Sequence, residues 1–185
     1  MVRRALKDMT LEEYWQLFPI ELSSHKLEWA EWARKEIAIL SEILNDYCPV
    51  INHIGSTAIP DIKAKPIVDI LVEIAPDCDL TNLVGLMESY GYICMSATAS
   101  RLSFNKGYTP DGYADKVFHI HIHRTGDNDE IYFRDYLRAN PESAYEYEKL
   151  KLQLLPAYRH DRDGYTAAKS DFVKRITDLA RLSAY

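Results

Sequence analysis

The spacing of apolar residues predicts helices at both ends of the chain and a β-rich segment between them. Thr10-Leu-Glu-Glu13 fits a capping box, so a short helix is expected over residues 11–17. Apolar residues then recur at spacings of three, four and seven over residues 24–46, which predicts a longer amphipathic helix that ends before Pro49. The apolar stripe of this helix consists of Leu27, Ala30, Ile37, Leu40 and Leu44, and it is widened by Trp29, Trp32, Ile39 and Ile43.

The middle of the chain contains short β-branched runs instead of a helical period. Residues 50–54 and 67–74 are expected to be strands, and residues 80–90 read as a helix that ends at Gly91. A stretch rich in turn residues, 106–115, is expected to separate the last two strands of the domain. The further strand candidates are residues 92–95, 101–105 and 117–124.

The last third of the chain is expected to be helical. A helix is predicted over residues 129–137, Asn140-Pro141 indicates the start of a second that runs to about residue 155, and a third is predicted over 165–181. This order predicts one α/β (or α+β) domain with a helical C-terminal part. Its parts are a helical N-terminus at 1–47, an α/β core at 48–126 and C-terminal helices at 127–185.

Composition narrows the classes of partner and compartment. The 185 residues include 22 basic and 28 acidic side chains, a net charge of −6, which argues against a general binder of DNA or of anionic membranes. No apolar run approaches the length of a membrane span, and the first ten residues lack the apolar region of a signal peptide. Together with cysteines that lack metal-type spacing, this predicts a cytoplasmic protein with the reduced thiols Cys48, Cys78 and Cys94.

The segment from His53 to Val72 is the first candidate for chemistry. Gly55-Ser56 follows a predicted strand, where backbone N–H groups and a hydroxyl can face an anion, or where the pair can form a plain turn with a helix cap. Asp69 lies in an otherwise apolar strand, so it either points into a site and binds metal or is a solvated strand residue.

The alternating run His119-Ile-His-Ile-His123 is the second candidate. A period of two places all three imidazoles on one face of a strand, and neighbouring histidines are ~6.6 Å apart. Adjacent members can therefore converge on one ion or phosphate, or serve in acid–base chemistry. The alternative is a polar strand face whose hydrogen bonds are satisfied by a covering loop.

Several of these features resemble the signature of the GrpB family, which is placed in the nucleotidyltransferase (polymerase-beta-like) superfamily. The resemblance rests on HIGSTAIPDIKAKPIVDILVEI, on Arg101-Leu-Ser-Phe-Asn-Lys-Gly upstream of the histidine strand, and on FRDYLRANPESAYEYEKLK followed by Tyr165-x-x-x-Lys169-x-x-Phe172. It implies a nucleotidyltransferase-like mixed sheet with flanking N- and C-terminal helices. It also implies that Gly55 and Ser56 contact a substrate phosphate and that Asp69 is the first metal carboxylate.

The sequence departs from the superfamily pattern at the second carboxylate position, which is occupied by Leu71. Glu73 lies on the same strand face, but its Cα is ~13 Å from that of Asp69, too far for an easily shared ion. A two-metal site is therefore not expected. A mixed site of histidine and carboxylate suits Zn²⁺, Mn²⁺ or Fe²⁺ better than Mg²⁺.

These observations give two functional hypotheses. The first is an enzyme that transfers a nucleotidyl or phosphoryl group with a divalent metal (Mg²⁺, Mn²⁺ or Zn²⁺), with Asp69, His121 and His123 as metal ligands and Asp69, His119 and His121 in catalysis. The second is a non-catalytic nucleotide- or phosphate-binding module that lost its second carboxylate. The expected partner is a small phosphorylated ligand rather than a long nucleic acid or a membrane. The expected substrate-binding residues are Gly55, Ser56, Thr57, Lys65, Arg101, Lys106 and Arg124.

Overall fold

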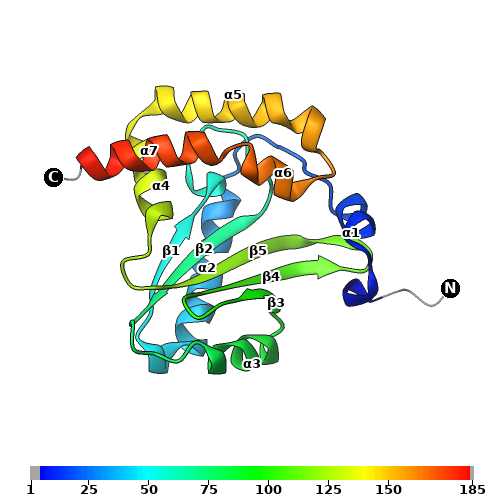
Figure 1. Ribbon diagram of the computed structural model, residues 1–185, viewed down its shortest axis with the longest axis vertical. Helices are drawn as coiled ribbons and strands as arrows, with labels where there is room; N and C mark the ends of the chain where they lie inside the picture. The colour runs from blue at the N-terminus through cyan, green and yellow to red at the C-terminus, as the bar shows by residue number, and fades with distance from the viewer. Residues whose placement is uncertain (1–4, 184–185) are drawn as a thin grey trace.

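A five-stranded mixed β-sheet forms the centre of the molecule in the computed structural model, which describes residues 5–183 (Figure 1). Residues 1–4 lie outside the described residues. They belong to the N-terminal segment that is expected to lack a signal peptide. The strand order across the sheet is β1-β2-β5-β4-β3. The strands are β1 (Val50–Ile54), β2 (Val68–Ile74), β3 (Ile93–Ala97), β4 (Arg101–Thr109) and β5 (Gly112–Arg124).

The pairing of β2 with β5 creates the feature on which the site depends. These two strands run parallel, whereas the pairs β1–β2, β5–β4 and β4–β3 are antiparallel. Asp69 is in register with His119, and Leu71 is in register with His121. Residues in register on neighbouring strands share a sheet face, so the acidic residue and the histidines project to the same side.

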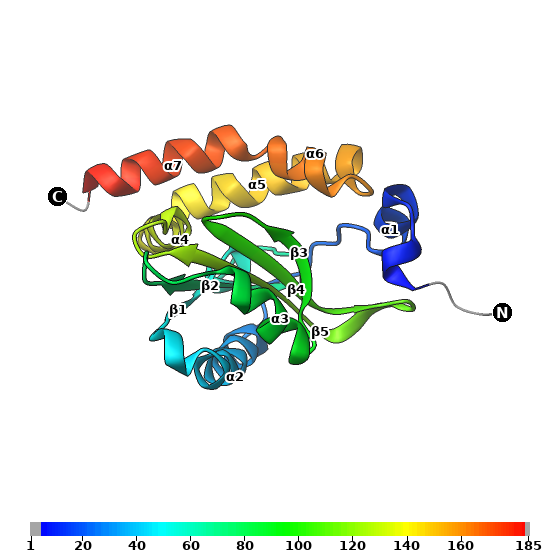
Figure 2. The same ribbon diagram turned by 60° about the horizontal axis from the view of Figure 1, so that its bottom comes forward.

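Helices cover both faces of the sheet (Figure 2). The helices α2 (Glu28–Ile43) and α3 (Thr81–Ser89) pack on one face, where they enclose an apolar core with Ile70, Val72, Ile120 and Ile122. The opposite face is covered by the C-terminal helices, and α1 (Leu11–Leu17) stands at one end of the sheet. The C-terminal helices are α4 (Asp129–Ala139), α5 (Pro141–Tyr158), α6 (Arg162–Ala167) and α7 (Ser170–Ser183).

The predicted mixed α/β fold is confirmed, and several of its elements lie where the local pattern placed them. Thr10 and Glu13 form a complete capping box at the start of α1. The predicted strand at 67–74 corresponds to β2, and the predicted helix at 80–90 corresponds to α3. Between residues 5 and 183, no helix combines the length and the apolar character needed to cross a membrane.

Three expectations about local structure were wrong. The stretch 106–115 is mostly strand, because β4 and β5 continue to a tight turn at Pro110-Asp111. The helix predicted over 165–181 is instead α6 and α7, separated by Ala168-Lys169. The predicted apolar face of α2 is wrong only in part: Trp29, Leu40 and Leu44 are buried, whereas Leu27 precedes the helix and is exposed. Ala33 and Glu36 complete the buried side, and hydrophobic periodicity misses Glu36 because it is acidic.

Candidate functional site

Asp69 and two histidines meet on the sheet face that the C-terminal helices cover. The Oδ1 atom of Asp69 is 3.2 Å from Nδ1 of His119 and 3.7 Å from Nε2 of His121. One ligand atom from each of the three side chains lies within 4.8 Å of the other two. Two ligands at ~2.1 Å from a tetrahedral ion are ~3.4 Å apart, so these side chains have the spacing and the chemistry of a metal site. We call them the Asp–His cluster.

The protonation states of the Asp–His cluster also favour a cation. Burial lowers the pKa of His119 to about 4, although the neighbouring Asp69 carboxylate acts to raise it. Burial alone would raise the pKa of Asp69, but hydrogen bonds with His119 and His121 hold it well below its usual range. At neutral pH the cluster therefore contains a carboxylate beside a neutral imidazole, which is the protonation state that metal ligands require.

Gly55 lies against the acidic member of the Asp–His cluster. Its φ of 70° is in the region that favours glycine, and a Cβ atom at this position would clash with Oδ2 of Asp69. The next residues form a single 3₁₀ turn, Ser56–Ala58, rather than the start of an α-helix. Gly55 and Ser56 both line the cavity beside Asp69, so the predicted Gly-Ser turn is adjacent to the predicted carboxylate.

A chain of hydrogen bonds holds His119 from the side away from Asp69. The Nε2 atom of His119 is 2.8 Å from the hydroxyl of Tyr108, and Nη1 of Arg162 donates to the same hydroxyl at 2.6 Å. Nη2 of Arg162 donates to the hydroxyl of Tyr113 at 3.1 Å. The sequence interpretation placed both tyrosines in a loop; they lie instead on the paired ends of β4 and β5, where Tyr14 of α1 stacks on Tyr108.

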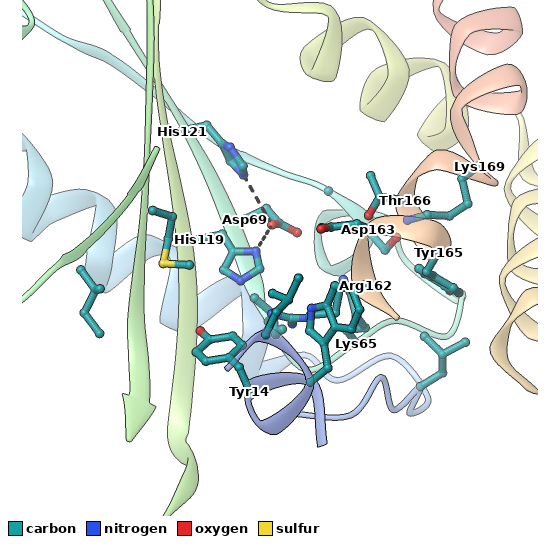
Figure 3. A pocket seen from close by; sticks show the side chains of 18 of the residues that line it. Tyr14, Lys65, Asp69, His119, His121, Arg162, Asp163, Tyr165, Thr166 and Lys169 are labelled. Atoms are coloured by element: carbon teal, nitrogen blue, oxygen red, sulfur yellow. Dashed lines mark ion pairs between the residues drawn. The ribbon is translucent and has the colours of Figure 1, made fainter. Parts of the chain in front are cut away.

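A cavity of about 880 Å³ opens over the Asp–His cluster and is bounded by α1, β3, α5 and α6. Figure 3 shows Asp69 between its two histidines, with the residues of α6 across the cavity. Two acidic and four cationic side chains line it. The acidic residues are Asp69 and Asp163, and the cationic residues are Lys65, Lys151, Arg162 and Lys169.

The three lysines among the cationic residues lie near two tyrosine rings, and Arg162 lies over a third ring, that of Tyr108. The Nζ atoms of Lys169 and Lys65 are 4.5 Å and 5.8 Å from the ring centre of Tyr165, and that of Lys151 is 4.7 Å from the ring of Tyr147. Burial and neighbouring positive charges lower the pKa of both Lys65 and Lys151 to about 7. Within residues 5–183, none of the four cationic groups forms an ion pair with a carboxylate, so this side of the cavity suits an anion. We call Lys65, Lys151, Arg162 and Lys169 the cationic wall.

The structure does not bring every predicted metal or turn residue into the cavity. His123 is buried, its Nδ1 is 2.9 Å from the carbonyl oxygen of Asp127, and it is not a member of the Asp–His cluster. In the cluster, His119 takes the position expected for His123. Thr57 is also buried, and its hydroxyl is 3.0 Å from Nε2 of His53. This contact stabilises the Gly-Ser turn from its protein side.

Three of the predicted basic residues lie away from the cavity. Arg101 forms an ion pair with Asp127 at 2.5 Å. The Nζ atom of Lys106 is 2.7 Å from the buried carboxylate of Glu36 on the other face of the sheet. Arg124 donates to the backbone carbonyls of Ala75, Cys78 and Ala99. Of the basic residues in the predicted set, Lys65 lines the cavity.

The structure supports the expectation that one strand does not supply two metal carboxylates. Leu71 is fully buried beneath the C-terminal layer. The side chain of Glu73 accepts hydrogen bonds from the backbone N–H of Gly126 at 3.0 Å and from Nδ2 of Asn128 at 3.1 Å. Glu73 therefore stabilises the β5–α4 connection, and Asp69 is the β2 carboxylate in the cavity.

Sequence reasoning missed Tyr14, Tyr108, Lys151 and Arg162 as site residues. Arg162 belongs to none of the quoted motifs, and Lys151 is the last residue of the segment FRDYLRANPESAYEYEKLK, to which no site role was assigned. Both reach the cavity only because α5 and α6 fold back over the sheet (Figure 2). Lys169, one helical turn after Tyr165 in the Tyr165-x-x-x-Lys169 motif, also lines the cavity.

The fold and the site define a mixed α/β protein with one carboxylate and two imidazoles at the base of a cationic cavity. Residues 19–179 match the family model described as GrpB protein. The chain therefore belongs to the GrpB family, as the resemblance in its sequence had indicated.

Sequence and structural similarity to other proteins covers most of the chain. It is 38% identical to the glutamate-rich protein GrpB of Alkalihalophilus pseudofirmus, over 84% of this chain and 92% of that protein. It is also similar to a crystal structure of the conserved protein GrpB from Enterococcus faecalis, with a TM-score of 0.73, 31% identity, and coverage of 86% of this chain and 96% of that one.

Other relatives are longer proteins. The chain is 38% identical to a UPF0157 protein of Pseudomonas aeruginosa over 70% of its own length, and 30% identical to the UPF0157 protein YqkA of Bacillus subtilis over 88%. The matched region spans only 54% and 47% of those two relatives, so the chain corresponds to about half of each.

Proposed function

We propose that the protein binds one divalent metal ion at Asp69, His119 and His121 and uses this centre to act on the phosphate of a small phosphorylated ligand. The observation that carries the proposal is the Asp–His cluster itself, whose ligand atoms all lie within 4.8 Å of one another at the base of a cavity. One carboxylate and two imidazoles favour Zn²⁺, Mn²⁺ or Fe²⁺ over Mg²⁺.

The surrounding residues prepare His119 for this role. A metal ion at Nδ1 of His119 requires the ring proton on Nε2. The Tyr108 hydroxyl oxygen lies 2.8 Å from Nε2 and can accept a hydrogen bond from this N–H. Arg162 in turn fixes the hydroxyl of Tyr108. Partners of this kind set the tautomer and orientation of a metal-bound imidazole.

The cationic residues of the cavity support a phosphorylated ligand. Lys65, Lys151, Arg162 and Lys169 provide positive charge that no carboxylate of the described chain neutralises by an ion pair, and Gly55-Ser56 lies beside Asp69. A bound divalent ion polarises a phosphoryl oxygen and stabilises the charge that develops during transfer. The lysines and Arg162 would bind the remaining phosphate oxygens and orient the reacting group.

The reaction that we propose is nucleotidyl or phosphoryl transfer, in line with the resemblance to the nucleotidyltransferase superfamily. The second candidate is a binding module without catalysis, and it is favoured by one specific observation: Leu71 is where the superfamily has its second metal carboxylate, and the side chain there is fully buried. The two candidates share the cavity and the cationic wall, and they differ in whether metal is required.

Thermal unfolding with added nucleotides distinguishes the two candidates. We expect ATP or CTP with Mn²⁺ to raise the Tm by several degrees, which corresponds to a few kcal/mol of binding energy at ligand concentrations of about 100 Kd. Asp69→Asn should abolish this shift, whereas Asp178→Asn on the exposed face of α7 should preserve it. Release of pyrophosphate, measured with the same samples, reports on nucleotidyl transfer, and release of the nucleoside diphosphate reports on phosphoryl transfer.

Each outcome of this experiment selects one reading. Equal Tm shifts with and without metal, preserved in Asp69→Asn, would favour the binding module. A lack of response to Mn²⁺, Zn²⁺, phosphate and nucleotides would contradict both.

A further inference from the structure

The cavity extends beyond the Asp–His cluster to a side that is apolar rather than charged. Strand β3, at the edge of the sheet, contributes Ile93 and Met95 to this side, and α1 contributes Leu11. These side chains are 40%, 48% and 59% exposed. Large apolar side chains that remain exposed and gather at one cavity are typical of a binding surface.

The strand register connects this apolar side to the Asp–His cluster. Ile93 pairs with Asn105, Asn105 pairs with His119, and His119 pairs with Asp69, so the four residues form one row across the sheet. Residues of one row project to the same face, and neighbouring strands are ~4.8 Å apart. Ile93 therefore lies on the same face as His119, about two strand spacings (~10 Å) away.

Helix α1 bounds the same row from above. Tyr14 stacks on Tyr108 with ring centres 5.9 Å apart and planes at 6°, and it also interacts with the side chain of Asn105. These contacts hold α1 beside the middle of the row, while Leu11, one turn earlier on the same helix, lines the cavity. The apolar wall is thus fixed relative to His119 by aromatic packing. We call Leu11, Ile93 and Met95 the apolar wall.

The apolar wall offers only hydrocarbon and thioether groups, whereas the cationic wall offers groups that bind anions. Both walls and the Asp–His cluster line the same cavity. Lys151 of α5 and Lys169, which follows α6, contribute amino groups to the cavity, and Lys65 contributes a third from the connection before β2. The volume of about 880 Å³ is much larger than a phosphate requires and is within the range of pockets that hold drug-sized ligands. One ligand that fills the cavity would contact both walls.

We infer that the ligand is amphiphilic: its phosphate binds at the Asp–His cluster and the lysines, and its organic body, an alkyl chain or an aromatic ring, lies along the apolar wall. An apolar body is favoured over a hydroxylated sugar because Leu11, Ile93 and Met95 carry no strong hydrogen-bonding group. The inference rests on the proposed function for the position of the phosphate. It adds the class of substrate, a phosphate ester of an apolar alcohol or phenol.

The test is calorimetric titration of the full chain with a series of phosphate monoesters at saturating Mn²⁺. The series consists of methyl, butyl, hexyl and phenyl phosphate, with AMP as a comparison. From methyl to hexyl phosphate the affinity should rise about twofold to fourfold for each added methylene, fourfold being the ~0.8 kcal/mol of a fully buried methylene. Hexyl phosphate should bind more tightly than AMP.

A double variant and a matched control assign this gain to the apolar wall. Ile93→Thr with Met95→Gln keeps the shape of two partly exposed strand residues and should reduce the gain per methylene to less than half, with the affinity for methyl phosphate unchanged within about twofold. Leu182→Gln on α7, where the side chain is 78% exposed and outside this cavity, should leave the whole series unchanged. Thermal unfolding confirms that each variant is folded.

The outcomes separate this inference from the function on which it rests. Equal affinity for methyl through hexyl phosphate would overturn the apolar substrate class while leaving metal-dependent phosphate binding intact. Tighter binding of AMP than of hexyl phosphate, unaffected by the double variant, would also overturn it. If no ester binds with or without Mn²⁺, the proposed function fails as well.

Discussion

Two networks centred on an acidic residue lie on opposite faces of the same sheet. On the face covered by α2, the Oε1 atom of Glu36 accepts hydrogen bonds from the hydroxyl of Tyr92 at 2.6 Å and from Nζ of Lys106 at 2.7 Å. The Nζ atom of Lys106 also lies 4.6 Å from the ring centre of Tyr92. This network pairs its positive and negative charges with each other.

The network on the other face has similar residue types, but its positive and negative groups are not paired with each other. Asp69 contacts His119 and His121, and the hydroxyl of Tyr108 links His119 to Arg162. The cationic group of this network, Arg162, interacts with tyrosine hydroxyls rather than with a carboxylate. Its buried Nε atom has no hydrogen-bond partner in the part of the chain that the structure describes.

The comparison shows how similar residue types serve stability in one place and binding in another. An acid that is fully paired inside the protein contributes to folding, and its loss leaves partners unsatisfied. An acid that faces a cavity beside the neutral imidazole of His119 and cations without ion-pair partners can still bind a ligand. The two networks therefore predict opposite responses to mutation.

The largest expected effect separates the two networks by metal binding. Asp69→Asn removes the only anionic ligand of the Asp–His cluster and should weaken Mn²⁺ or Zn²⁺ binding by about 100-fold or more, since groups that merely orient a ligand contribute about 10- to 100-fold. The free energy of unfolding without metal should fall by only about 1–2 kcal/mol, because the Asp69 carboxylate accepts the hydrogen bonds that hold its pKa below the usual range. Equilibrium dialysis and urea unfolding measure the two quantities. Unchanged metal affinity would contradict the assignment.

The converse variant acts on the paired network. Glu36→Gln should lower the free energy of unfolding by about 1.5–3 kcal/mol, because hydrogen bonds to a charged group are lost and Lys106 is left unpaired. Metal affinity should stay within twofold of the unchanged protein. Glu42→Gln, at an exposed position of the same helix, serves as the control in urea unfolding. An equal effect of both substitutions would show that the Glu36 network contributes little.

A smaller effect tests the link from Tyr108 to the cluster. Tyr108→Phe keeps the ring that packs between Tyr14 and His119 but removes the hydroxyl that orients Nε2, so metal affinity should fall about 10-fold. Tyr113→Phe removes hydrogen bonds with Arg162 and with the carbonyl oxygen of Phe18, neither of which involves the Asp–His cluster, and should change the affinity less than twofold. Equal losses in both variants would indicate a general effect of disturbing Arg162.

The last expected effect concerns Lys151, which has no ion-pair partner in the described part of the chain but donates a hydrogen bond to the carbonyl oxygen of Lys63. Burial and the charge of Lys169 lower the pKa of Lys151 to about 7, with Glu148 and Lys65 as the other charged neighbours. The folded protein then holds fewer protons than the unfolded chain between about pH 7 and the ordinary lysine value near 10.5, so stability should rise with pH across this range. Lys151→Met should remove about 2–3 kcal/mol of the rise between pH 7 and pH 9.5.

Urea unfolding at pH 7 and pH 9.5 measures the effect. Lys149→Met, at an exposed position on the same helix, should retain the full rise and serves as the control. A rise that is the same in both variants would mean that Lys151 is already paired or solvated in the folded state.

Local sequence patterns predicted the elements that depend on neighbouring residues. The capping box of α1 is formed by residues three apart, and the face shared by His119, His121 and His123 follows from strand alternation alone. Alternation also allows adjacent histidines to converge, and both His119 and His121 contact Asp69, which is in direct register with His119. Local patterns could not decide this register, because it depends on how two distant strands pair.

The predicted set of basic residues shows the limit of such patterns. Lys106 and Arg101 are near the histidine strand in sequence, yet the pleat of β4 and the pairing with Asp127 direct them away from the cavity. Arg162 contacts Tyr108 across 54 positions of the chain, and Lys106 contacts Glu36 across 70. No periodicity spans such separations.

The sequence by itself determined the fold class, the family and the residue types of the candidate centre, since alternation, capping and the Gly-Ser turn are local properties of the chain. Only the tertiary structure decided which histidines accompany Asp69, which cations line the cavity and which acid is already paired. Each of these outcomes depends on the register of β2 with β5 and on the return of α5 and α6 over the sheet. Side chains acquire partners only when such distant segments pack together.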